Sequence, residues 1–358
     1  MSSVVAYREL DQLDQLRLAW NALLGETDEA TLFQTLEWYQ FSLRTLRPNW
    51  RPCVLVAKSL GKPIGILPLC IEETRTRWGT LRKLVPPPAT EGASFRPIGR
   101  QVTATIVTVA RFLRQHPRWW DVAEWTGIER QGWDRGRTED AFANAGIRWN
   151  SNGQRLVARE RLADPEHGQP PAGTEIGCFG SRPSTEVAAR GGNWSTVELR
   201  PVAARFGDGD PQWPWFDRWI NEIAWEHLTI NIPTDLDPRI FLEQLHSFAS
   251  ERGVGKILVV RHKEVAVGFQ YQLIWDGAVI VAAEGQQADS AGRRNRVFQE
   301  VIHQEVCDSG RRDGDRWIEF PIEETGQVKP MQEMIVRQSY RGCSRPGWSH
   351  MWRWLKSG

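Results

Sequence analysis

The chain has 358 residues, of which 41% are hydrophobic and 25% are charged, and its formal net charge is +1 at pH 7. This length exceeds one ordinary domain and the composition is that of a folded protein, so we expect two globular domains. A net charge near zero provides no broad electrostatic attraction for DNA or for an anionic membrane. Any anion-binding site must therefore be local.

The cysteines and the first residues indicate a compartment. The five cysteines are widely spaced and no two of them form a CxxC pair, which favours a reducing environment over a disulfide framework. Charged side chains follow the N-terminus too soon for a secretory signal, and no apolar run approaches membrane-spanning length. The sequence therefore predicts a cytoplasmic protein without a membrane-inserted segment.

The first half of the chain reads as an α/β unit. A Pro/Gly-rich stretch at 81–101 is predicted as a loop, and its Arg96-Pro-Ile-Gly-Arg100 is only a faint counterpart of the Ser-Ala-Gly-Arg-Arg stretch at 290–294 in the second half. Apolar periodicity and turn residues predict helices at Asp11–Leu24, Thr31–Leu46, Val102–Gln115 and Thr138–Ala145, and strands at Val4–Tyr7, Cys53–Lys58, Pro63–Glu72, Asp121–Trp125 and Gln154–Glu160.

Residues 161–194 are rich in Pro, Gly and small polar residues and are predicted to link the two halves irregularly. Order resumes with a strand at Thr196–Val202, a Trp-rich helix at Trp213–Trp225 and a helix at Asp237–Arg252. The chain holds 19 Trp, which we interpret mainly as large core residues, with stacking on sugar rings as the alternative.

The most regular stretch runs from Lys256 to Ser309. Three Val- and Ile-rich segments are predicted as an antiparallel meander, and Asp276-Gly277 between the last two is a strong hairpin signal. A polar loop then opens a helix from Val297. A helix N-terminus favours an anion, so Ser290, Gly292, Arg293 and Arg294 suit a phosphate, although a solvated loop explains them equally well.

The two strand pairs repeat without a gap. At a constant offset of 203 residues, the separation of Val54 and Ile257, apolar positions and one glycine coincide: Val56 with Val259, Ile64 with Val267, Gly65 with Gly268 and Ile71 with Ile274. Two strands of similar composition can match by chance, but a helix precedes both pairs. We therefore predict a duplicated domain.

Pieces of the second half occur in the order of one enzyme family. They are Glu222-Ile-Ala-Trp225, Val267-Gly268-Phe269, the strand to Ala283, Ser290-Ala291-Gly292, the helix from Val297, Ile318-Glu319-Phe320 and Val328-Lys329. Over roughly half of the chain this order resembles the FemAB-like, CelD-type acetyltransferases, a branch of the GNAT acyltransferase superfamily that is associated with cellulose biosynthesis.

The resemblance implies an α/β (α+β) fold of tandem GNAT-like domains, each a mixed, mostly antiparallel sheet flanked by helices. The first domain would span residues 1–160 and have a shaping or binding role rather than a catalytic one. The second would span 195–358 and carry an acyl-CoA site. It further implies cofactor contacts from Val281, Ala283, Ser290, Gly292, Arg293 and Arg294, proton removal by Glu284 or Glu319, and acceptor contacts from Trp225, Gln286 and Lys329.

The implied reaction is direct transfer of an acyl group, most simply acetyl, from acyl-CoA to an amine in a ternary complex. The acceptor would be a small molecule, for instance an amino sugar or an envelope polysaccharide precursor. No metal is predicted, because His303 and Cys307 share a helix face without a further ligand spaced to join them.

Two alternatives stay open. FemAB relatives use aminoacyl-tRNA as the acyl donor, and the low net charge argues against tRNA here. A non-catalytic GNAT-fold binding or scaffold protein is the other. It is motivated by Ala291, which stands where the family has Pro, and by a basic inter-domain run of which Arg182 and Arg190 remain between Gly and Pro residues.

Overall fold

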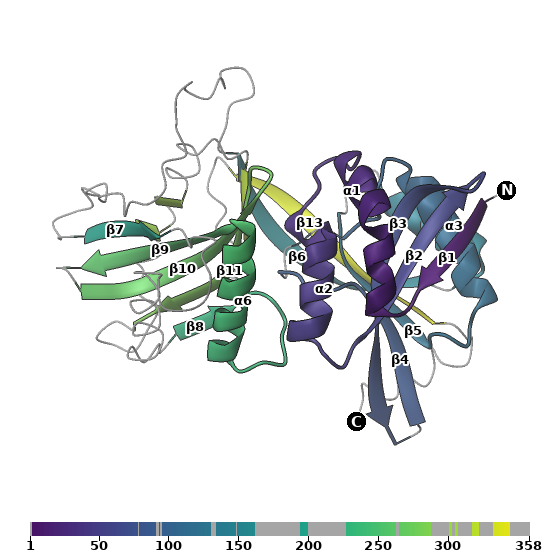
Figure 1. Cartoon of the computed structure of the whole chain (residues 1–358), viewed down its shortest axis with the longest axis horizontal. Helices are drawn as coiled ribbons and strands as arrows, with labels where there is room; N and C mark the ends of the chain where they lie inside the picture. Colours follow the sequence, from purple (N-terminus) through teal and green to yellow (C-terminus); the bar gives the residue numbers. More distant parts are fainter. Residues whose placement is uncertain are drawn as a thin grey trace, which may run out of the picture. The chain divides into compact units, whose positions relative to one another are not determined.

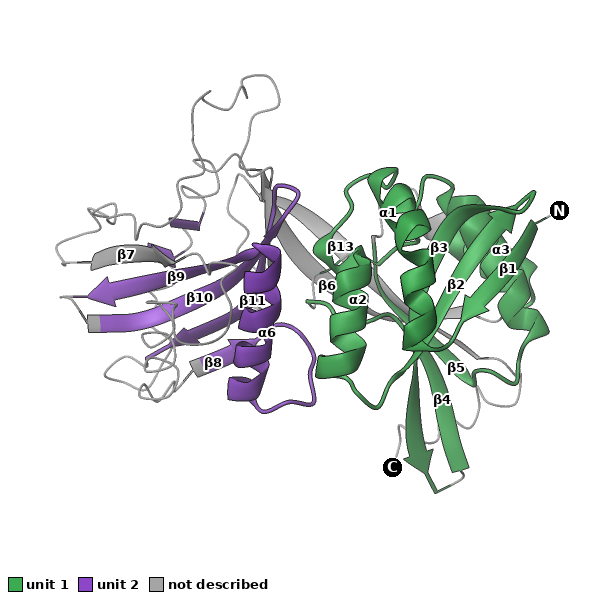
Figure 2. Cartoon of the chain, in the orientation of Figure 1, with its two compact units in different colours: residues 1–157, 334–358 green, residues 158–333 purple. Residues whose placement is uncertain are grey.

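The structure is a computed structural model that describes residues 2–77, 79–90, 93, 95–129, 134–147, 149–161, 194–199, 227–262, 265–287, 301–302, 305–306, 317–321 and 332–343. The chain forms two compact units (Figure 2). Unit 1 comprises Met1–Val157 and Met334–Gly358, and unit 2 comprises Ala158–Glu333. Residues from 334 onward, which the sequence assigned to the second domain, thus belong to unit 1.

Unit 1 is built on a mostly antiparallel sheet (Figure 1). Strands pair in the order β1-β2-β3-β4-β5, followed by β13, and only β4 and β5 run parallel to each other. Their bounds are β1 (Ser2–Tyr7), β2 (Arg51–Ser59), β3 (Lys62–Thr76), β4 (Gly79–Val85), β5 (Val122–Glu129) and β13 (Gln332–Cys343), and β6 spans Trp149–Arg161.

The helical segments in the first part of unit 1 are shorter than the helices that the sequence predicted there. Thr35 keeps an extended backbone and its hydroxyl accepts a hydrogen bond from the Trp38 amide at 3.1 Å, so one predicted helix is broken at Thr35 into separate segments. The segments are η1 (Leu10–Leu16), α1 (Arg17–Gly25), η2 (Leu32–Gln34), α2 (Leu36–Phe41), the π-helix η3 (Ser42–Leu46), α3 (Val102–Gln115) and α4 (Asp134–Asn144).

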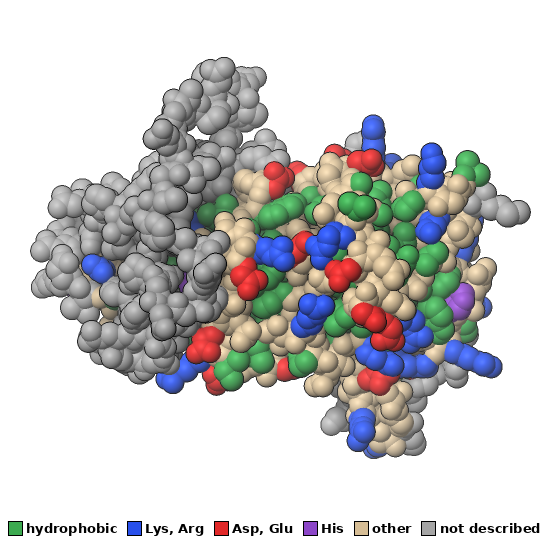
Figure 3. All heavy atoms as spheres, viewed as in Figure 1, with side chains coloured by type: hydrophobic (Ala, Val, Ile, Leu, Met, Phe, Trp, Pro, Cys, Tyr) green, Lys and Arg blue, Asp and Glu red, His purple; other side chains and the backbone are tan. Residues whose placement is uncertain are grey.

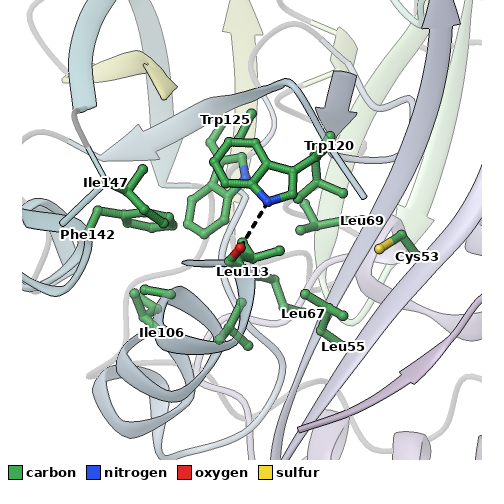
Figure 4. Close-up of a cluster of buried hydrophobic side chains, with 14 of the residues drawn as sticks. Cys53, Leu55, Leu67, Leu69, Ile106, Leu113, Trp120, Trp125, Phe142 and Ile147 are labelled. Carbon is green, nitrogen blue, oxygen red and sulfur yellow. Dashed lines mark hydrogen bonds between the residues drawn. The ribbon is translucent and has the colours of Figure 1, made fainter. Parts of the chain in front are cut away.

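The sheet of unit 1 is buried on both faces. Alternate residues of β2 point to opposite sides, so Leu55 packs towards α3 while Val54 and Val56 pack towards α1 and α2. Figure 4 shows the first of these cores, in which the fully buried Trp120 donates a hydrogen bond from its indole nitrogen to the Leu113 carbonyl at 3.2 Å. Burial on both faces explains why β2 reads as an unbroken apolar run.

Opposite charges lie next to each other on the surface of unit 1. On the face drawn in Figure 3, basic and acidic side chains are interspersed. In one such group Arg17 bonds both Asp14, at 2.9 Å, and Glu37. The hydrogen bond from Arg17 lowers the pKa of the Asp14 carboxyl. Local pairing of this kind is consistent with the formal net charge of +1.

Unit 2 repeats the architecture. Its strands pair in the order β7-β9-β10-β11-β12, and only β11 and β12 are parallel. The helix predicted at Asp237–Arg252 is α6, which Asp237 caps, Pro238 begins and Gly253, with φ 65°, ends. The bounds are β7 (Trp194–Leu199), β8 (His227–Ile230), α6 (Pro238–Arg252), β9 (Gly255–His262), β10 (Val265–Trp275), β11 (Ala278–Gln286) and β12 (Trp317–Pro321).

The duplicated strand pairs agree in register. Val56 pairs with Ile66 in unit 1, and 203 residues further on Val259 pairs with Phe269 in unit 2. Each pair also has an irregularity at the same place, which leaves Ile64 unpaired in unit 1 and Val267 unpaired in unit 2. Both pairs occupy the same position in their sheets, so the prediction of two equivalent α/β domains is confirmed.

The strand β4 corrects the sequence analysis, which had included residues 81–85 in a long loop. These residues pair antiparallel with β3 and parallel with β5. Residues 81–85 were predicted as loop because three prolines follow Val85. Proline ends a strand, but it does not prevent the residues before it from forming one. β4 is therefore the counterpart of β11 in unit 2.

A close approach of α3 to β3 makes Gly65 sensitive to substitution. A Cβ built at Gly65 would lie 2.1 Å from the Thr105 hydroxyl oxygen in the first turn of α3, whereas a Cβ at Gly25 would have no atom within 4 Å. We expect Gly65→Ala to lower the free energy of unfolding by about 1–3 kcal/mol through overpacking. Gly25→Ala is the control, and equal losses in urea titrations of the two variants would contradict this explanation.

Candidate active site

Two different strands share one edge of β11. Over Ala278–Ile280 this edge pairs with β12 in parallel, and over Ala283–Gln286 it pairs with β8 in antiparallel register. The other edge pairs with β10 along the whole strand. The point where β12 ends and β8 begins is therefore a change of partner in the middle of β11.

A β-bulge marks this point. Tyr271 of β10 pairs with Ala283 and Gln272 pairs with Val281, so Ala282 is the extra residue. The Val281 and Ala282 carbonyls both face Asn231, which donates to Ala282 from its backbone at 3.0 Å and to Val281 from its side-chain amide at 3.1 Å. Asn231, the residue after β8, thus holds the bulge in place.

Glu284 lies two residues past the bulge and is part of a polar chain. The Gln270 amide donates to the Glu284 carboxylate at 3.2 Å, and the Gln272 amide donates to the Gln270 carbonyl oxygen at 2.8 Å. Both glutamines are buried, and Lys256, also buried, pairs with Gln272 across β9 and β10. Glu284 is half-buried, and its carboxylate lies at the end of a row of oriented amides.

The opposite face of the sheet carries a phenol that is not a base. The Tyr271 hydroxyl lies 3.2 Å from Nδ1 of His246 on α6, and both side chains are buried. Burial raises the pKa of the Tyr271 hydroxyl, so the phenol stays protonated at neutral pH. Its position beside α6 makes it a packing and hydrogen-bonding group of the core.

The residues proposed from the sequence are distributed unevenly. Val281 and Ala283 flank the bulge, and Gln286 is buried at the end of β11. Glu319 pairs with Ile280, before the bulge, and Ile280 and Glu284 point to opposite faces because a bulge shifts the alternation by one residue. The residues that lie outside the described parts of the chain are Trp225, Ser290, Gly292, Arg293, Arg294 and Lys329.

Four features of this region were not predicted from the sequence: Asn231, Gln270, Gln272 and the strand β8. A signal for the two glutamines was present, since they alternate with Phe269, Tyr271 and Leu273 in an otherwise apolar strand. No comparable signal marked β8, because four residues are too few for a periodic pattern.

The corresponding region of unit 1 is closed by the chain itself. Ile71 pairs with Leu84 in unit 1 and the equivalent Ile274 pairs with Val279 in unit 2, so Pro86–Pro88 occupy the positions of Val281–Ala283. Proline has no amide hydrogen to offer a ligand.

The segment that follows the prolines bridges two strands of unit 1. Phe95 donates to the Gly127 carbonyl of β5 at 3.1 Å, and Ile98 exchanges two hydrogen bonds with Ile66 of β3, at 2.8 and 2.9 Å. A Cβ at Gly127 would lie 2.2 Å from the Ala93 carbonyl oxygen, which shows how closely this segment approaches β5. The strands β3 and β5 are thus joined here by the protein's own backbone.

Two cysteines of unit 1, Cys53 and Cys70, are not nucleophiles. Cys53 and Cys70 are buried on opposite faces of the unit 1 sheet, and burial raises the pKa of Cys53 to about 12 and raises that of Cys70 as well. Both thiols are therefore protonated at neutral pH. A thiolate mechanism at these two positions is excluded.

The raised thiol pKa predicts a loss of stability in alkali. The folded state holds Cys53 protonated up to pH 12, whereas the unfolded thiol ionises near pH 9. Its contribution is fully present below pH 9 and is lost as pH rises towards 12, at about 1.4 kcal/mol per pH unit. We expect urea titrations between pH 9 and 11 to show a shallower decline for Cys53→Ala than for wild type. Equal slopes would contradict the buried, protonated thiol.

Metal-binding clusters and membrane-spanning helices are absent from the described residues. Within these ranges no cluster of three or more His, Cys, Asp or Glu side chains is arranged to hold a metal ion. His303 and Cys307, weighed in the sequence analysis, lie outside them. Among the described helices, none combines the length and the apolar character that crossing a membrane requires.

Comparisons with known proteins place the fold. No family model and no curated protein matches the sequence. Among solved structures, a tandem GNAT protein from the clavulanic acid biosynthesis pathway aligns with TM-score 0.50 and 13% identity, covering 97% of this chain and 99% of the other. FemX aligns with TM-score 0.51 and 8% identity over 90% of this chain and 95% of its own. The chain therefore has the tandem GNAT fold, as the sequence predicted.

Proposed function

We propose that the protein is an N-acyltransferase that transfers an acyl group, most simply acetyl, from acyl-CoA directly to an amine. The observation that carries this proposal is the end of β11 in unit 2, where a bulge, a change of strand partner and the half-buried Glu284 lie within a few residues. The tandem GNAT fold supports an acyl-transfer chemistry, and the positions equivalent to Val281–Ala283 in unit 1 are prolines.

The reaction needs three things from the protein. It must hold the amine against the thioester carbonyl, take the proton that the amine loses, and support the oxyanion while the C–N bond forms and the C–S bond breaks. Glu284 is the base in this proposal, because the hydrogen bond from Gln270 fixes the orientation of its carboxylate. The amine attacks the thioester directly, so no covalent nucleophile is required. Glu319 is the alternative base. The departing thiolate takes up a proton from water.

The remaining roles come from the resemblance to the FemAB-like, CelD-type family. Val281 and Ala283, on either side of the bulge, would contact the pantetheine arm, and Ser290, Gly292, Arg293 and Arg294 would bind the pyrophosphate at the start of a helix. Trp225, Gln286 and Lys329 would contact the acceptor, for which an amino sugar or an envelope polysaccharide precursor is the class we propose. No metal takes part in the proposed reaction.

Calorimetric titration with acetyl-CoA, longer acyl-CoAs and free CoA tests donor binding. Release of CoA thiol in the presence of a panel of amino sugars then tests transfer. We expect one acyl-CoA bound per chain and thiol release that depends on the amine. Binding of none of the acyl-CoAs would contradict the proposal, and transfer from an aminoacyl-tRNA instead would favour the FemAB-type alternative.

A non-catalytic binding or scaffold protein is the second candidate function. It is favoured by β8, which already fills the edge of β11 that an acyl-CoA arm would need. Binding of acyl-CoA without release of thiol for any amine in the panel would support this alternative over the enzyme.

A further inference from the structure

The strand β8 is a short piece of backbone paired with the part of β11 that follows the bulge. Its register pairs His227 with Gln286, Thr229 with Glu284 and Ile230 with Ala283. The Asn231 amide continues the pairing by donating to the Ala282 carbonyl at 3.0 Å. Because bonded pairs alternate along an antiparallel ladder, the next bonded pair after Asn231 and Ala282 is Thr229 and Glu284.

The alternation is fixed independently from the other edge of β11. The Gln287 amide donates to the Val267 carbonyl of β10 at 3.0 Å, which places the backbone groups of residue 287 on the β10 side. Residues 286 and 284, by alternation, direct their backbone groups to β8. The amide of Thr229 therefore faces β11, and that of Leu228 faces away from it.

The place that β8 occupies is the one that an extended, amide-bearing ligand needs. Such ligands add to a free strand edge through backbone hydrogen bonds. β12 covers the edge of β11 only as far as Ile280, and beyond the bulge the edge is taken by β8. The pantetheine arm of acyl-CoA carries two amides and is extended, so it has the same hydrogen-bonding chemistry as β8.

Unit 1 shows the contrast. There Ile98 pairs with Ile66 as Gly285 pairs with the equivalent Phe269 in unit 2, so the segment after the prolines takes the place of the second half of β11. This segment bonds β5 directly through Phe95, and Trp38 anchors it by donating to the Pro88 carbonyl at 2.7 Å. In unit 2 the second half of β11 is paired instead with β8, which is four residues long and in which Leu228, Thr229 and Ile230 are only half-buried. A short strand pairing of this kind is marginal by itself.

We propose that β8 is an exchangeable strand that occupies the place of the acyl donor's amide arm on β11, and that donor binding displaces it. This inference rests on the proposed function, since it takes acyl-CoA as the donor. Pairing of β8 with β11 lowers the apparent affinity for the donor, because only the fraction of molecules in which the edge is free can bind it. It also frees the Val281 and Ala282 carbonyls from Asn231 at the moment when a donor arrives.

Thr229→Pro in the full chain tests this proposal by calorimetry with acetyl-CoA. The change removes one backbone hydrogen bond between β8 and β11, and we expect acetyl-CoA to bind about two- to tenfold more tightly than to wild type. Leu228→Pro, whose amide faces away from β11, and Thr229→Ala, which keeps the amide, are the controls. Both should stay within about twofold of wild type.

Hydrogen exchange of the wild-type protein gives a second reading that does not depend on a variant. Saturating acetyl-CoA should speed amide exchange at Thr229 and Asn231 while Glu284 and Gln286 remain protected by the new partner. Tighter binding by Thr229→Pro alone, together with this exchange pattern, supports the exchangeable strand.

Three results would overturn it, and they separate this inference from the proposed function. If wild type and Thr229→Pro bind acetyl-CoA equally well, acyl-CoA stays the donor but β8 is not an exchangeable strand. If acetyl-CoA binds without changing the hydrogen-exchange rates of the Thr229 and Asn231 amides, the same conclusion follows. Absence of binding in every variant overturns both the exchangeable strand and acyl-CoA as the donor.

Discussion

Glu284→Gln should lower the rate of acyl transfer by about 100-fold or more while leaving the fold and the affinity for acyl-CoA unchanged. The amide that replaces the carboxylate still accepts the hydrogen bond from Gln270, so the geometry at the end of β11 is retained. The amide has no basicity at neutral pH, and the proton of the attacking amine loses its acceptor. Single-turnover rates with a saturating amine measure the effect.

Glu319→Gln is the matched control, because it changes the same residue type on the neighbouring strand β12. We expect that variant to keep most of its activity. If Glu319→Gln is the inactive variant and Glu284→Gln is not, the two roles are reversed. If neither variant loses activity, water removes the proton and the assignment of Glu284 as base is wrong.

Trp120→Ala should lower the free energy of unfolding of unit 1 by about 3–5 kcal/mol, the largest stability effect that we expect. Trp120 is fully buried between β2, β3 and α3, and its indole nitrogen bonds the Leu113 carbonyl in the last turn of α3 (Figure 4). The change leaves a cavity and removes one of the two hydrogen bonds that the Leu113 carbonyl accepts, the other coming from the His116 amide. Urea titration followed by circular dichroism measures the loss.

Trp50→Ala is the control for Trp120→Ala. Trp50 is half-buried at the margin of the other core, with the Arg47 guanidinium 5.3 Å from the centre of its ring. Its removal should cost less than half as much, because less apolar area leaves water on folding. Equal losses in the two variants would contradict the placement of Trp120 at the centre of the core.

The meander of unit 2 was predictable because its signals are local. Asp276 and Gly277 both adopt positive φ, 48° and 71°, which is the turn that an Asp-Gly hairpin requires. The repeat at an offset of 203 residues fixed the equivalence of the two strand pairs and carried the register with it. Alternating apolar residues and the turn signals were sufficient for these elements.

The elements that shape the candidate site were not predictable in the same way. β8 forms because its backbone pairs with β11, more than 50 positions further along, and β13 pairs with β5 across an even longer separation. Neither pairing leaves a local pattern in the sequence. The bulge at Ala282 depends on the register of β10 and on Asn231, so the face on which Glu284 lies could not be read from alternation alone.

A crystal structure of the full chain with bound acetyl-CoA tests the central claim most directly. The proposal predicts one acetyl-CoA per chain, with the thioester carbonyl beside the bulge at Ala282, the carbonyl carbon facing Glu284, and the pantetheine arm on the edge that β8 occupies in the free protein. A thioester bound beside Pro86–Pro88 in unit 1, or bound in unit 2 away from β11, would contradict it.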